Sequence, residues 1–139
     1  MAFELTRIGN LLKKLGKEAQ ETHKMNVSDV QLLIKSVNTF RTFLEGSNLN
    51  SQDLSRTSQS IDRQFSYGED WKNIPELKGS SVQIGNIMIV ASAMANNPEK
   101  AMAQYGDETT IRQNIVGLMT NLEKALIALL YKIKRKSAA

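Results

Sequence analysis

Apolar residues recur at intervals of three and four along most of the chain, which is the spacing of helices with one buried face. The first such stretch predicts a helix from about Phe3 to about Lys24. Gly9 and Gly16 weaken this helix by roughly 1 kcal/mol each relative to alanine, so we expect packing or a partner to compensate. Its apolar stripe consists of Leu5, Ile8, Leu12, Leu15 and Ala19.

The second predicted helix has a clear start. Ser28 is followed three residues later by Gln31, the spacing of a capping box. Val27 and Leu32 are placed to form a hydrophobic staple around that start. Gly46 marks its end, because glycine commonly terminates helices.

A third helix is predicted from the cap residue Asn50 to the terminating Gly68. Between Ser47 and Ser66 the residues are mostly Ser, Thr, Asn and Gln. The few apolar positions form a thin seam, so we expect this helix to be the least stable element. These positions are Leu54, Ile61 and Phe65. The segment from Gly68 to Gly79 that follows is predicted to be a loop.

The stretch after this loop is apolar on nearly all sides. Ser80 and Gln83 form a second capping box at its start. Ile, Met, Val and Ala then fill most positions up to Ala95. A helix that is apolar all round is normally buried, so we expect this helix to be the centre of the fold.

Two further helices complete the pattern. Asn97-Pro98 begins a short helix that ends at Gly106. Asp107 then caps a long last helix from about Glu108 to about Lys136. Its apolar stripe is nearly unbroken and consists of Ile111, Ile115, Leu118, Leu122, Leu126, Leu129 and Ile133.

The predicted fold is therefore all-α: one domain, residues 1–139, forming a bundle of about five helices. The 139 residues are 41% apolar, which suits one compact domain. The longest apolar run, Val82 to Ala95, is interrupted by polar residues and is shorter than the ~18–20 residues of a membrane-spanning helix. The start of the chain lacks the features of a secretion signal, so a cytoplasmic location is expected.

The composition leaves little room for catalysis. The chain has no cysteine and one histidine, His23, which excludes disulfides, thiolate chemistry and zinc sites made of Cys and His. No phosphate-binding glycine loop and no pair of Glu-x-x-His motifs occurs. We therefore predict a protein that is not an enzyme, with no catalytic residue, metal or cofactor.

Basic residues carry the stronger functional signal. The chain has 18 Lys and Arg against 14 Asp and Glu, a net charge of +4. Clusters of positive charge can bind nucleic-acid phosphates without reading sequence. We predict backbone contacts, to RNA or to a single strand, from three groups: Arg7, Lys13, Lys14 and Lys17 on the first helix, Arg56 and Arg63 on the third, and Lys132, Lys134, Arg135 and Lys136 on the last.

Aromatic residues lie close in sequence to one of these cations, Arg63, and to a further lysine, Lys72. Phe65, Tyr67 and Trp71 occur within ten residues of Arg63 and Lys72. Aromatic and cationic side chains together can stack unpaired bases. The simpler interpretation, which we favour, is that Phe65 and Trp71 close one end of the bundle.

The second half of the chain resembles the small helical subunits of CRISPR effector complexes. The resemblance lies in residues 89–105, IVASAMANNPEKAMAQY, and in the Leu/Ile stripe that continues to Ile133. It is a resemblance of architecture without a diagnostic motif. It implies a ribonucleoprotein of antiviral defence, with guide RNA and other protein subunits as partners.

Two alternative functions remain open. The chain could be a self-assembling structural subunit of a virion or filament, with its apolar first and last helices packed between copies. It could also be a membrane-surface protein, since a basic amphipathic N-terminal helix can lie on anionic lipid.

Overall fold

The computed structural model describes residues 2–22, 24–79 and 81–138, which are helical almost throughout and contain no strand. In chain order the elements are α1 (Ala2–Glu21), α2 (Val27–Gly46), α3 (Ser51–Tyr67), the 3-10 helix η1 (Glu69–Asn73), α4 (Pro75–Lys78), α5 (Ser81–Asn96), α6 (Pro98–Tyr105) and α7 (Glu108–Ala138). The all-α prediction is confirmed. The helix count of about five is too low, because the described residues form seven α-helices.

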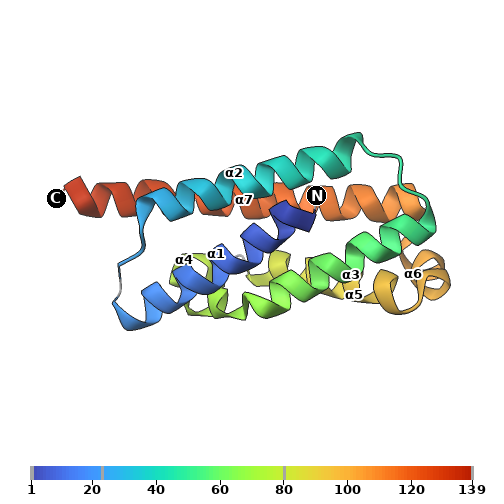
Figure 1. The fold of residues 1–139 in the computed structure, drawn as a ribbon, viewed down its shortest axis with the longest axis horizontal. Coiled ribbons are helices and arrows are strands. Elements are labelled where there is room, and N and C mark those ends of the chain that lie inside the picture. The colour runs from blue at the N-terminus through green and yellow to red at the C-terminus, as the bar shows by residue number, and fades with distance from the viewer. Residues whose placement is uncertain (1, 23, 80, 139) are drawn as a thin grey trace.

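The helices pack in two layers that share one core. α2 lies along α7 in one layer and α3 lies along α5 in the other (Figure 1). α1 crosses the bundle diagonally and contacts α2, α3 and η1. α5 also packs on α7, which joins the layers.

The core contains the apolar stripes that the spacing predicts. Leu5, Ile8, Leu12, Leu15 and Ala19 of α1 are all buried. The thin seam of α3, made of Leu54, Ile61 and Phe65, is fully buried as well. Because α1 faces inward with its whole stripe, its charged side is left facing outward.

Three of the predicted helix caps are confirmed. The side-chain oxygen of Asn50 accepts a hydrogen bond from the Asp53 amide at 2.8 Å. Asn97 and Asp107 cap the starts of α6 and α7 in the same way. Each cap satisfies an amide that has no partner inside its helix.

The predicted cap of α2 is wrong. Asn26, two residues before Ser28, is the cap, and its Oδ1 accepts from the Asp29 amide at 3.1 Å. Ser28 and Val27 therefore lie inside the helix, so neither the capping box nor the predicted staple forms. With this start, Met25 and Val30 occupy the staple positions, and Met25 packs partly buried against the core. The Ser80 capping box falls outside the described residues.

The end of α1 and the predicted loop also differ from the sequence prediction. α1 ends at Glu21 rather than near Lys24, because the Thr22 hydroxyl donates to the Glu18 carbonyl and accepts from the Lys24 amide in a turn. The segment predicted as a loop, 68–79, folds instead into η1 and α4. Pro75 begins α4 at the position where proline fits a helix.

α5 is less enclosed than its composition predicts. Ile84, Ile87 and Met94 are fully buried on its inner side. On its outer side Val82 is 62% exposed and Ile89 is 57% exposed. The expectation that this helix is buried on all sides is therefore wrong, since α3 and α7 cover only part of it.

Close packing explains the two glycines of α1. A Cβ at Gly9 would overlap the Gln64 side chain of α3, and a Cβ at Gly16 would overlap the backbone carbonyl of Asp70 in η1. The glycines therefore allow α1 to lie directly against the end of α3 and against η1. Packing compensates for their low helix propensity, as the sequence requires.

Gly16→Ala should destabilise the fold. The gain in helix propensity is smaller than the cost of displacing the Asp70 backbone, so we expect a loss of about 1–3 kcal/mol in the free energy of unfolding, measured by urea denaturation. Gly117→Ala is the matched control, because nothing lies within 4 Å of an added Cβ there. It should raise stability by up to about 1 kcal/mol. Equal effects of the two substitutions would contradict the close contact.

Candidate nucleic-acid interface

The structure divides the predicted basic face of α1. Lys14 extends toward α2, where its Nζ lies 2.6 Å from Oδ2 of Asp29. Arg7 is half-buried, with its guanidinium 4.4 Å from the ring centroid of Phe3 and Nη1 4.0 Å from Oε2 of Glu4. Lys14 thus has a close carboxylate partner inside the chain, whereas Arg7 packs on Phe3 and makes only a long contact with Glu4.

The ion pair affects the pKa of Lys14. The hydrogen bond to Asp29 and the negative charge of that carboxylate raise the pKa of the Lys14 ammonium above its usual value. Lys14 therefore stays charged, and its ammonium, although the side chain remains exposed, is held by a carboxylate at the contact between α1 and α2.

Lys13 has a different partner, an aromatic ring on α3. Its Nζ lies 4.3 Å from the ring centroid of Tyr67, within the range of a cation–π contact. Tyr67 is 49% exposed. The contact joins the outward side of α1 to the outward side of α3.

Further cations continue this surface on both helices. Lys17 lies one helical turn after Lys13 on α1, and Arg63 lies one turn before Tyr67 on α3. Arg56 is seven residues before Arg63 on the same side of α3, about 10 Å along the axis. We call this set the α1–α3 basic surface: Lys13, Lys17, Arg56, Arg63 and Tyr67.

The arginines of this surface are free of strong ion pairs. Arg56 is highly exposed, and its Nη1 lies 4.0 Å from Oδ1 of Asp53, which is exposed as well. Such a contact contributes little in water. Within the part of the chain that the structure describes, Arg63 and Lys17 have no ion pair. Glu69 and Asp70, which follow Tyr67, bound the surface at its η1 end.

The C-terminal cluster is divided in the same way. The Nζ of Lys132 lies 3.1 Å from Oε1 of Glu76, which ties α7 to α4. Lys134, Arg135 and Lys136 are exposed. The last turns of α7 extend beyond the neighbouring helices at one end of the molecule (Figure 1). This tail is separate in sequence and helix from the α1–α3 basic surface.

The favoured interpretation of the aromatic segment is confirmed in its main point. Phe65 and Trp71 are buried in the core. Tyr67 is exposed, so it alone of the three is available to a ligand. The apolar spacing of the third helix already separated Phe65 from Tyr67, but the contact of Tyr67 with Lys13 depends on where α1 crosses the end of α3.

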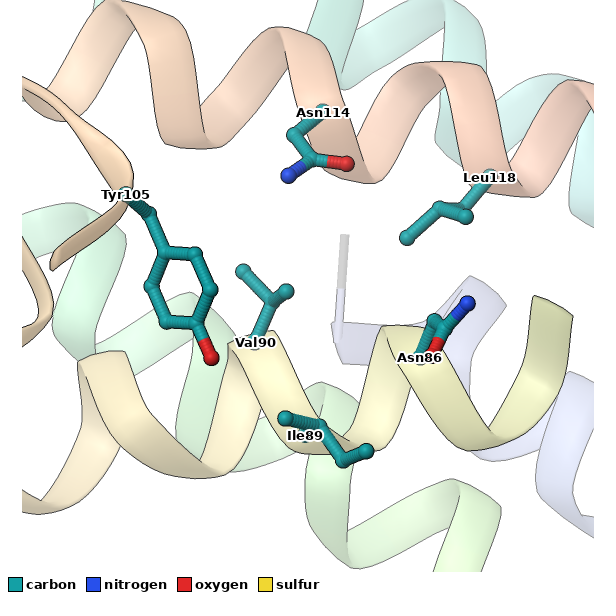
Figure 2. A pocket seen from close by; sticks show the side chains of 6 residues that line it. All are labelled: Asn86, Ile89, Val90, Tyr105, Asn114 and Leu118. Carbon is teal, nitrogen blue, oxygen red and sulfur yellow. The ribbon is translucent and has the colours of Figure 1, made fainter. Parts of the chain in front are cut away.

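A shallow hollow of about 230 Å³ lies between α5, α6 and α7 (Figure 2). The side chains around it are Asn86, Ile89, Val90, Tyr105, Asn114 and Leu118. A second hollow, of about 320 Å³, lies between α5 and α6 and has Lys100 as its one charged residue. Neither hollow gathers the ionisable groups that acid–base catalysis uses.

The structure contains no metal-binding cluster of three or more His, Cys, Asp or Glu among residues 2–22, 24–79 and 81–138. His23 lies outside these residues. In the same ranges, no helix combines the length and the apolar character needed to cross a bilayer.

The apolar stripe of α1 is not available to a membrane or to another copy. Leu5, Ile8 and Leu12 pack inside the chain. Phe3, at 65% exposure, is the one large apolar residue that α1 presents to solvent within its described side chains. The two alternative functions that rely on an exposed first helix therefore lose that part of their basis.

No protein-family model matches the chain, and no curated protein or solved structure matches it either.

The partner of Lys14 leads to a test by chemical labelling. Acylating reagents attack neutral amines, and each unit of pKa increase lowers the neutral fraction about tenfold. At about pH 9 Lys14 should therefore be acylated more slowly than Lys17, as measured by mass spectrometry of the digested protein. Asp29→Asn should bring Lys14 to the rate of Lys17 and leave Lys17 unchanged. Equal rates in the unmodified protein would show that the ion pair is absent.

Proposed function

We propose that this chain is a non-enzymatic helical subunit that binds single-stranded nucleic acid on its α1–α3 basic surface. RNA is the nucleic acid we propose first. The observation that carries the proposal is the contact between Lys13 and Tyr67. It joins a cation of α1 to an exposed ring of α3, and helix spacing puts Lys17 and Arg63 one turn away from these two residues.

Each part of the surface suits a different part of a nucleotide. Lys17, Arg56 and Arg63 are exposed cations that phosphate oxygens attract. The Tyr67 ring, held on one side by Lys13, can stack an unpaired base on its other face. A duplex keeps its bases stacked inside, so this combination favours single strands.

The tail formed by Lys134, Arg135 and Lys136 would supply a second phosphate contact at the end of the molecule. A subunit with two contacts of this kind suits a ribonucleoprotein in which neighbouring proteins share one strand. Membership of a CRISPR-type complex, with guide RNA and other subunits as partners, stays a prediction based on the architectural resemblance.

Removing charge from the surface should weaken binding in a salt-dependent way. The triple variant Lys13→Gln, Lys17→Gln and Arg63→Gln should bind single-stranded RNA less tightly. The slope of log affinity against log salt should flatten by up to about 2, or ~0.7 for each lost phosphate contact. Fluorescence anisotropy with a labelled oligonucleotide at several salt concentrations measures the affinity and its salt slope.

The matched control removes the same charge elsewhere. Lys35, Lys100 and Lys124 are exposed and lie on α2, α6 and α7. Their triple change to Gln should leave the slope nearly unaltered. A parallel change of Lys134, Arg135 and Lys136 to Gln tests the tail. Equal flattening by the surface variant and the control would indicate only a general charge effect and would reject the proposed surface.

Tyr67 should contribute stacking rather than charge. Tyr67→Ala should weaken single-strand binding by about 1–3 kcal/mol without changing the salt slope, because a stacked base is worth roughly that much. Tyr67→Phe keeps the ring and should bind nearly as well. If Tyr67→Phe fails like Tyr67→Ala, the hydroxyl is responsible and stacking is wrong. Duplex probes should show little difference between the variants.

A further inference from the structure

α5 differs from the rest of the chain in having no charge. Its sequence, SVQIGNIMIVASAMAN, contains no Asp, Glu, Lys or Arg. Every other helix that the structure describes contains at least one. Its outer side nevertheless exposes Val82 and Ile89 to solvent. Exposed apolar residues without surrounding charge mark protein interaction surfaces.

The outward residues of α5 follow the spacing of a helix-pairing seam. Successive intervals of four, three, four and three residues place them on one line, as the a and d positions of a heptad do. They are the exposed residues Val82, Asn86, Ile89 and Asn96 and the half-buried Ala93, which also packs against the core. We call this line the α5 seam. Three of its five members are apolar or small, and Asn86 is a polar residue of the type that fixes register in paired helices.

The flanks of the α5 seam permit close approach. Gly85 lies beside it, and nothing stands within 4 Å of a Cβ built there. Ser92, half-buried, occupies the equivalent position two turns later. The hollow of about 230 Å³ borders Asn86 and Ile89, so a side chain from a facing helix has space to enter (Figure 2).

We propose that the α5 seam pairs with the α5 seam of a second copy of this chain. A twofold interface brings identical residues near one another, so any charge in it meets its own sign. The chain carries a net charge of +4, and two copies can therefore approach best through residues without charge. The five residues of the α5 seam have none, and Lys100 borders only its Asn96 end. Lipid and nucleic acid are poorer occupants, because α5 has no basic residue to attract their anionic groups.

Ile89 is the central residue of this pairing. It has two seam positions on each side, so it faces the Ile89 of the other copy whether the helices run parallel or antiparallel. Ile89→Asp would place two carboxylates together and should abolish the dimer. Because the Ile89 side chain is largely exposed, the variant should keep its fold, which circular dichroism checks.

Sedimentation equilibrium of the full chain at concentrations up to about 1 mM, the weak end of ordinary affinities, tests the proposal. We expect the unmodified protein to dimerise, Ile89→Asp to be monomeric, and Leu32→Asp to dimerise like the unmodified chain. Leu32 is the matched control, because it is an exposed apolar residue on α2.

Charge reversal makes the test specific to this contact. A one-to-one mixture of Ile89→Asp and Ile89→Lys should recover a dimer, since unlike charges then meet at the centre of the seam. Three results would overturn the proposal: a monomeric unmodified chain, a dimer that survives Ile89→Asp, or a mixture that stays monomeric. The assay contains no nucleic acid, so its outcome is independent of the function proposed for the α1–α3 basic surface.

Discussion

The close contact of α1 with the end of α3 and with η1 is the constraint on which the rest of the structure depends. Gly9 and Gly16 let the α1 backbone approach Gln64 and Asp70 without an intervening Cβ. That approach turns the leucine stripe of α1 into the core and leaves the lysines of its other side facing solvent. It also sets Lys13 against Tyr67, so the same packing that completes the core creates the candidate binding surface.

Local signals in the sequence predicted most of the fold because they act within one helix turn. Asn50 and Asp107 cap their helices where the sequence places them. Ser28 failed because Asn26 offers an equally good capping side chain two residues earlier, and the choice depends on whether Met25 can reach the core. The predicted loop folded as η1 and α4 because Trp71, Ile74 and Leu77 bury their side chains, which is a tertiary effect.

The candidate site was predictable as a list of cations but not as a surface. Lys14 and Lys132 look like their neighbours in the sequence, yet each binds a carboxylate on another helix. Lys13 and Tyr67 are far apart along the chain and meet only because α1 crosses α3. Ion pairs and cation–π contacts between helices depend on how the helices are placed. The residue pattern of a single sequence does not reveal that placement.

α5 shows how one sequence pattern can have two structural outcomes. A helix that is apolar on nearly all sides is normally buried. From the sequence alone, the other helices of the same chain are expected to surround it. In the structure α3 and α7 cover the inner side, while Val82 and Ile89 remain exposed. Within one copy, only part of the apolar surface of α5 is therefore buried and contributes hydrophobic stabilisation. A second copy, with the same uncharged seam, could cover the remainder without burying a charge, which the basic surfaces of α1, α3 and α7 could not do.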